Sequence, residues 1–132
     1  MKKSVAVILG AVMLFSAWLI YSKHAERRRE AAYAAAMAPL QHDLRFGMTR
    51  ADVDRYLHST GTYYSWINFG HAETYVIPIG EEPGTLVCKP WKVYVALEFE
   101  PADKTKGARA RSELDPSDKL KDVHIKKMGT CL

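Results

Sequence analysis

An uncharged apolar run near the start of the sequence constrains this chain more than any other feature. Residues 4–21, SVAVILGAVMLFSAWLIY, carry no charge over eighteen positions and follow two lysines. A run of this length is enough for a helix to cross the hydrocarbon core of a bilayer, and Trp18 and Tyr21 suit the headgroup level. The run therefore predicts a membrane anchor over residues 1–21.

A cleavable signal peptide has the same layout of a basic start and an apolar middle, and it is the alternative interpretation. Cleavage requires small residues one and three positions before the cut. For a cut after Ala17 the residue at minus three is Phe15, and for a cut after Ala25 it is Lys23. No cysteine for lipid attachment follows the run. We therefore expect an uncleaved anchor, and a buried helix of a soluble protein is the third interpretation.

The excess positive charge lies beside the apolar run. The net charge is +4, and residues 1–30 hold six basic against two acidic groups, whereas residues 31–132 hold thirteen of each. A nucleic-acid-binding domain carries its excess on the folded part, so nucleic acid is not an expected partner. Both flanks of the run are basic, so the positive-inside rule barely chooses an orientation.

Residues 22–40 are typical of a helical stalk. The stretch SKHAERRREAAYAAAMA is rich in alanine and long charged side chains, which favour helix, so the membrane helix is predicted to continue to Pro39. Arg27, Arg28 and Arg29 are flanked by two glutamates and indicate a solvated helix face, with an anionic-lipid contact as the alternative.

The globular domain, residues 41–132, is predicted to open with a capped helix. Within LRFGMTRADVDRYL, residues 44–57, Thr49 suits the N-cap, and Asp52 is spaced to reach back to the Thr49 backbone amide. Gly61 suits the left-handed residue that follows a helix end near Thr60.

The same helix has an apolar and a charged side. Val53 and Leu57 share one face, which we expect to meet a core, whereas Arg50 and Asp54 are spaced to pair on the outside. Every residue of this stretch thus has a structural explanation.

The pattern changes from helical to alternating after this helix. Aromatic and β-branched residues predict strands over residues 62–69, 73–79 and 87–100, with a last strand around Val123 and Ile125. The apolar residues at positions 91, 93, 95, 97 and 99 alternate with Lys92, Glu98 and Glu100, which are predicted to lie on the face opposite the core. Residues 101–118 are polar with Pro and Gly, which indicates a mobile loop. The expected fold class is α+β, with one or two helices packed on a three- or four-stranded antiparallel sheet.

Cys88 and Cys131 are the only cysteines, and they lack the paired spacing of a zinc site or a redox motif. Two distant cysteines in a small domain fit one disulfide in an oxidising compartment. If the last two strands pair so that Phe99 faces Leu120, Cys88 faces Cys131. The apolar faces differ by one residue from this register, and a bulge near residues 126–128 would reconcile them. We therefore expect a Cys88–Cys131 disulfide.

A family resemblance rests on the capped helix. FGMTRADVDRYL at residues 46–57, with Gly61 after it, resembles the opening motif of the SmpA/OmlA (BamE-like) family. The FE at residues 99–100 and the KLKDV at residues 119–123 look like the closing hairpin of that family. The resemblance implies a small two-layer α+β domain in the bacterial envelope that contacts other proteins and has no catalytic residues. Members of the family are typically lipoproteins, whereas this chain has no lipidation cysteine.

No catalytic residue, cofactor or metal site is predicted. Neither a nucleophile elbow nor a paired HxxxH or HxH motif occurs, and a metal site would require His71, His124 and a cysteine to converge. The histidines stand singly and are interpreted as surface residues: His24, His42, His58, His71 and His124.

The strongest interaction signal is TYYSWINFG, residues 62–70. In a strand, Tyr64 and Trp66 point to one side, and Tyr63 and Ile67 point to the other, so both faces carry large side chains. One face must meet the helix, and the other is covered by the chain itself or binds a partner. Tyr64 and Trp66 are the candidate partner-binding residues.

Together these patterns predict a non-catalytic interaction domain tethered to the bacterial inner membrane by a single pass, with the C-terminal domain in the periplasm. The expected partner is another envelope protein, and a role in envelope assembly or maintenance fits. The alternative is a small-ligand-binding or catalytic domain whose site forms only in three dimensions, near His71 or His124.

Overall fold

The computed structural model describes residues 2–69, 72–103 and 114–131, and of these the side chains outside residues 2–6, 69 and 72–73. Within these residues, two helices and four strands follow one another in the order α1, α2, β1, β2, β3, β4. The chain forms two compact units, Met1–Ala35 and Ala36–Leu132. His71 and residues 104–113 of the predicted loop lie outside the described residues.

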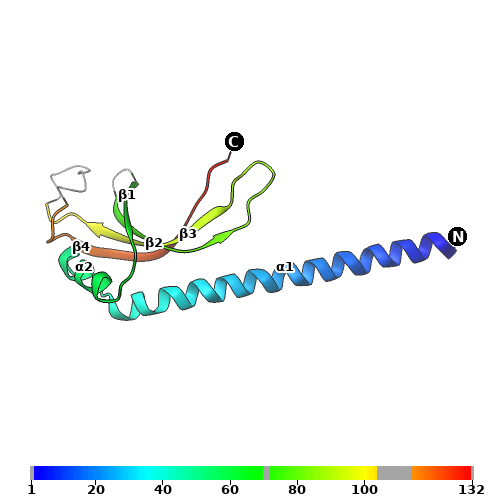
Figure 1. The fold of residues 1–132 in the computed structure, drawn as a ribbon, viewed down its shortest axis with the longest axis horizontal. Coiled ribbons are helices and arrows are strands. Elements are labelled where there is room, and N and C mark those ends of the chain that lie inside the picture. The colour runs from blue at the N-terminus through cyan, green and yellow to red at the C-terminus, as the bar shows by residue number, and fades with distance from the viewer. Residues whose placement is uncertain (1, 70–71, 104–113, 132) are drawn as a thin grey trace. The chain divides into compact units, whose positions relative to one another are not determined.

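Helix α1 (Lys2–Asp43) is continuous through the apolar run and the stalk (Figure 1). It is the one helix in the described part of the chain that is long and apolar enough to cross a membrane. Its large apolar side chains between Val7 and Tyr21 are exposed. The helix continues past Pro39, the predicted end of the stalk, because Leu40 is buried in the core of the second unit.

Helix α2 (Arg50–Ser59) begins and ends as its sequence predicts. Thr49 is the N-cap, and its Oγ1 accepts a hydrogen bond from the Asp52 amide at 3.3 Å. The Thr49 hydroxyl in turn donates to the Asp52 carboxylate at 2.7 Å. Gly61 has a φ of 64° just past the helix end, a conformation that glycine adopts without strain.

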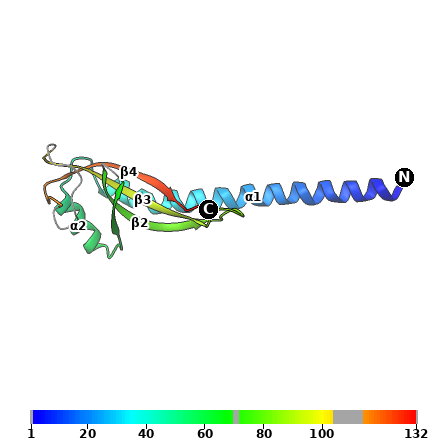
Figure 2. The same cartoon turned by 90° about the horizontal axis from the view of Figure 1, so that it is seen from above.

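The four strands form one antiparallel sheet in the order β1-β2-β3-β4, which confirms the α+β class. Figure 2 shows the long β2–β3 hairpin reaching beyond β1, since only the first part of β2 pairs with that short strand. The strand bounds are β1 (Ser65–Phe69), β2 (Ala72–Glu82), β3 (Trp91–Glu100) and β4 (Lys119–Met128).

One face of the sheet packs on α2 and on the end of α1, and we call it the helix face. Val53 and Leu57 of α2 are fully buried there against residues of the central strands. Their neighbours in this core include Leu40, Leu44, Tyr75, Ile77, Val95, Leu97, Phe99, Leu120 and Val123. The opposite face, here the outer face, carries the alternate residues of the same strands.

The β3–β4 ladder contains a bulge at its other end from the one predicted near residues 126–128, and the register shifts again by one residue between the Lys92–Met128 pair and the Cys88–Cys131 bridge, just past the predicted position. Phe99 pairs with Leu120 as expected, and Lys121 is then an extra residue on β4, whereas residues 126–128 pair without interruption. Leu120 and Val123 are both buried although three positions apart, and a regular strand would point them to opposite faces. The bulge at Lys121 resolves that conflict.

Arg50 was predicted to pair with Asp54 on the outside of α2, and that prediction was wrong. Its side chain is only 2% exposed, and its guanidinium lies 4.0 Å from the Phe99 ring centroid and 5.0 Å from that of Tyr75. The two aromatic faces and the carboxylate of Asp118 make the interior favourable for this cation.

Candidate functional site

The aromatic residues proposed from the sequence as partner-binding lie on the helix face. Tyr64 and Trp66 are partly buried and pack against the core. The Tyr64 hydroxyl donates to Asp54 Oδ1 at 2.7 Å, and the Tyr75 hydroxyl donates to Asp54 Oδ2 at 3.3 Å. Asp54 is therefore satisfied by two phenols rather than by Arg50, and the side chains of Tyr64 and Trp66 remain partly exposed on the helix face.

Burial also governs the chemistry of this aromatic cluster. It is the largest cause that raises the pKa of Tyr75, and the adjacent Arg50 opposes the shift. The phenol therefore stays neutral and keeps its proton for Asp54. The Tyr64 and Tyr75 rings pack in a tilted arrangement with ring centroids 4.8 Å apart. Tyr64 also lines a surface hollow of about 430 Å³ together with His58 and Tyr63.

The outer face is hollowed where the β2–β3 hairpin extends beyond β1. Two hollows of about 400 Å³ each adjoin there and share Glu81, Lys92 and Tyr94. We call them together the outer groove. One hollow is also lined by Lys89, Pro90, Met128, Gly129 and Thr130, and the other by Tyr63, Ser65, Pro78 and Gly80.

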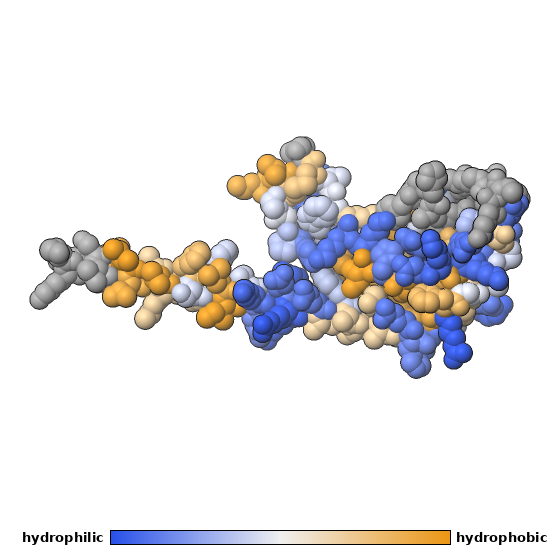
Figure 3. Space-filling model, turned by 180° about the vertical axis from the view of Figure 1, so that it is seen from behind, coloured by the Kyte–Doolittle hydropathy of each residue, from blue (hydrophilic) through white to orange (hydrophobic). Residues whose placement is uncertain are grey.

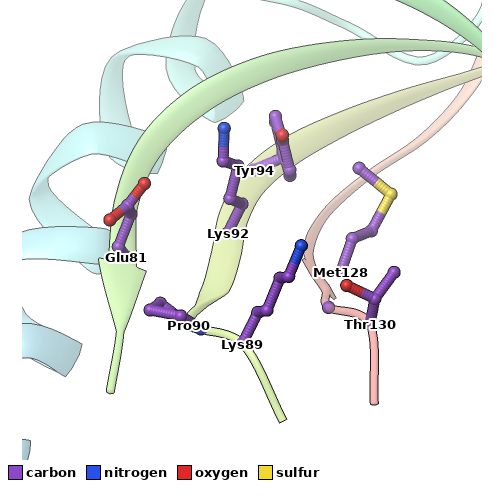
Figure 4. A pocket seen from close by; sticks show the side chains of 8 residues that line it. Glu81, Lys89, Pro90, Lys92, Tyr94, Met128 and Thr130 are labelled. Carbon is purple, nitrogen blue, oxygen red and sulfur yellow. The ribbon is translucent and has the colours of Figure 1, made fainter. Parts of the chain in front are cut away.

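The outer groove is aromatic at its centre and basic at its rim. Tyr94 lies between Pro78 and Lys126 in the strand register, so all three belong to one face. Lys89 and Lys92 are exposed, and their side chains extend into the hollow in Figure 4. Two lysines against one glutamate in the lining leave the groove with a positive balance.

The hairpin tip beside this groove is apolar and cross-linked. Leu86 is fully exposed and Val87 is 61% exposed, and Figure 3 shows apolar surface on the projecting tip. The Sγ atoms of Cys88 and Cys131 lie 1.99 Å apart, at disulfide distance, and the two residues form an isolated antiparallel bridge. Lys89 N donates to the Thr130 carbonyl at 3.0 Å beside it. The tip is thereby held to the C-terminal segment.

A titratable cluster occupies the outer face next to the bulge. Glu98 and Asp122 are direct cross-strand partners, and His124 lies two residues beyond Asp122 on the same face. His124 Nδ1 lies 3.0 Å from Asp122 Oδ2, and its Nε2 lies 3.7 Å from Glu98 Oε1. One donor atom from each residue lies within 4.8 Å of the other two.

The sequence analysis did not predict this cluster, because it considered His124 as a metal ligand only together with His71 and a cysteine. The alternation in β3 did place Lys92 and Glu98 on the face opposite the core, which is where the structure has them. The pairing of Glu98 with Asp122 depends on the bulge at Lys121, and the hydrophobic pattern indicated a displacement of one residue without locating it there.

Comparisons of the chain with family models, with curated proteins and with solved structures found no match. The candidate site therefore rests on the geometry described above.

Proposed function

We propose that this chain is a membrane-tethered interaction domain that binds an extended, acidic segment of another protein along the outer groove. The observation that carries the proposal is the groove itself. Two adjoining hollows on the outer face join an aromatic floor to a basic rim.

The lining has the composition of a polypeptide-binding surface. Tyr and Met are enriched in protein interfaces, and here Tyr94 and Met128 supply apolar contact beside the aliphatic stems of Lys89 and Lys92. The ammonium groups favour a partner with carboxylates and raise its rate of association. The exposed Leu86 at the hairpin tip adds an apolar anchor within the same region.

The tether supports a location at the membrane. We infer that residues 1–21 of α1 cross the bacterial inner membrane once and that the domain lies in the periplasm. The length and apolar composition of α1 support the first part, and the Cys88–Cys131 pair at disulfide distance supports an oxidising compartment. The resemblance of residues 46–57 to an envelope family agrees with a partner in the envelope.

Site-specific photo-crosslinking in intact cells tests the proposal. A photoreactive residue in place of Tyr94 in the full-length chain should yield an adduct with a discrete partner. The same residue at Lys121, an exposed position on the β4 edge, is the matched control and should yield little. Equal adduct patterns at both positions, or none at Tyr94, would contradict binding in the outer groove.

The alternative of a site for a small ligand or a reaction has one observation in its favour. Glu98, Asp122 and His124 converge on the outer face in a way that no sequence motif indicates.

A further inference from the structure

We propose that Glu98, Asp122 and His124 bind a divalent transition-metal ion, with Zn²⁺ as the probe that fits the donor set. Two carboxylates and one imidazole are ligands that Zn²⁺ accepts, at about 2.0–2.2 Å from each donor atom. This site is separate from the outer groove and does not depend on the proposed function.

The spacing of the donors suits a single ion. Ligand atoms around a tetrahedral ion with bonds of about 2.1 Å lie roughly 3.4 Å apart. The three donor atoms already lie within 4.8 Å of one another, so rotamer adjustments on the order of 1 Å bring them into range. Three protein ligands leave a fourth position open for water.

Strand pairing holds the backbone that carries the three side chains. All three residues lie on paired strands, and the bulge at Lys121 brings Asp122 directly opposite Glu98. Bulges recur beside functional sites because they re-aim a side chain. His124 pairs with Ala96, whose small side chain is fully buried, so no bulky neighbour stands opposite the imidazole on β3.

The electrostatics of the apo cluster also favour a cation. Two carboxylates directly opposite each other on neighbouring strands repel. The side chains of Glu98, His124 and Asp122 are 22%, 36% and 49% exposed, so the cluster is only partly screened by solvent and an ion can reach it. A divalent ion would offset this repulsion.

The test is Zn²⁺ titration of the full-length protein in detergent, purified without a polyhistidine tag and followed by competition with a chromophoric chelator. One ion should bind per chain. His124→Ala and Glu98→Gln should each weaken the affinity by at least about ten- to hundredfold, which is the loss that removal of even an outer-shell partner of a ligand causes. Far-UV circular dichroism and thermal unfolding establish that each variant folds, and Glu98→Gln keeps the test decisive if His124→Ala does not.

The His42–Asp43 pair is a matched control within the chain. His42 Nδ1 lies 2.7 Å from Asp43 Oδ1, which is a histidine–carboxylate pair like that of His124 with Asp122, but the described residues supply no third ligand there. His42→Gln should leave Zn²⁺ affinity unchanged. Absence of stoichiometric binding, or equal losses in His42→Gln and His124→Ala, would overturn the proposal.

Visible spectroscopy with Co²⁺ in place of Zn²⁺ gives a second readout. Intense d–d bands in the wild type that disappear in Asp122→Asn would place this residue in a low-coordinate site. Bands that persist unchanged in Asp122→Asn would contradict its role as a ligand.

Discussion

Arg50 Nη2 lies 3.3 Å from Asp118 Oδ2 in the interior of the domain, with the two side chains 2% and 0% exposed. The contact joins the first residue of α2 to the residue before β4. Backbone bonds strengthen the same connection, because Arg50 N donates to the Asp118 carbonyl at 2.7 Å. Asp118 Oδ1 also accepts from Ala102 N at 2.8 Å, so this one side chain ties both ends of segment 101–118 to the start of α2.

Asp118→Asn should lower the free energy of unfolding by about 3–5 kcal/mol, because it removes the carboxylate that lies against the buried Arg50 guanidinium. Urea unfolding measures the loss. Asp122→Asn is the control, since its carboxylate is 49% exposed, and it should stay within about 0.5 kcal/mol of the wild type.

A double-mutant cycle separates this pair from general core disruption. The loss in Arg50→Met with Asp118→Asn should fall well below the sum of the two single losses, because once one member of the pair is replaced the second change no longer breaks their contact. Additive losses would contradict a coupled buried pair.

Tyr64→Phe and Trp66→Phe test how much the contacts of these two side chains contribute to stability. Tyr64→Phe removes a 2.7 Å bond to the Asp54 carboxylate and should cost about 1.5–3 kcal/mol. Trp66→Phe breaks no hydrogen bond of the indole, because the buried Nε1 has no hydrogen-bond partner in the described part of the chain. Its cost in stability should therefore be smaller than the cost of removing a hydrogen-bonded indole. Thermal unfolding compares the two. Unchanged stability in Tyr64→Phe would contradict the role of the Asp54 contact.

Helix α2 should weaken in acid through its capping carboxylate. The hydrogen bond from the Thr49 hydroxyl holds the pKa of Asp52 below its ordinary value of 3.8. The folded state therefore favours the ionised form, and its stabilisation is present above about pH 3.8 and is lost as the pH falls through the folded-state value. NMR titration should show the Asp52 pKa rising in Thr49→Val. An unchanged pKa in that variant would contradict the assigned cause.

Much of the fold could be predicted from local sequence patterns. The predictions that were wrong share a physical cause. The capping residues Thr49 and Gly61 set the ends of α2 through contacts with residues close in sequence, so both helix ends could be predicted. Arg50 was misplaced because its environment comes from Asp118 and two rings, contacts that helical spacing does not report. A charged residue, which usually lies at the surface, can be buried when the fold supplies both an ion-pair partner and aromatic rings.

The candidate sites were harder to predict, because they too depend on contacts between residues that are distant in sequence. The alternation of residues 91–100 placed Lys92 and Glu98 opposite the core. The outer groove also needs Met128 from β4 and Pro78 from β2, whose proximity follows from the register. Register is set by turns and bulges, which the hydrophobic pattern specifies only in part.

Removal of the cross-link at the hairpin tip should destabilise the domain. The bond would close a loop with a sequence separation of 43, and the combined Cys88→Ser and Cys131→Ser change should lower stability by about 2–4 kcal/mol. Chemical unfolding of the oxidised wild type against the double variant measures this. Two free thiols, found by non-reducing mass spectrometry of protein isolated from its native cells, would contradict the disulfide.

The most direct test of binding in the outer groove is the charge dependence of crosslinking at Tyr94 in intact cells. Lys92→Glu reverses one charge in the outer groove, and Lys121→Glu makes the same change on the exposed β4 edge, outside the residues that line the groove. Binding of an acidic partner predicts that Lys92→Glu strongly reduces the adduct at Tyr94 while Lys121→Glu leaves it near the wild-type level. An adduct that survives Lys92→Glu, or that falls equally in both variants, would contradict recognition by the outer groove.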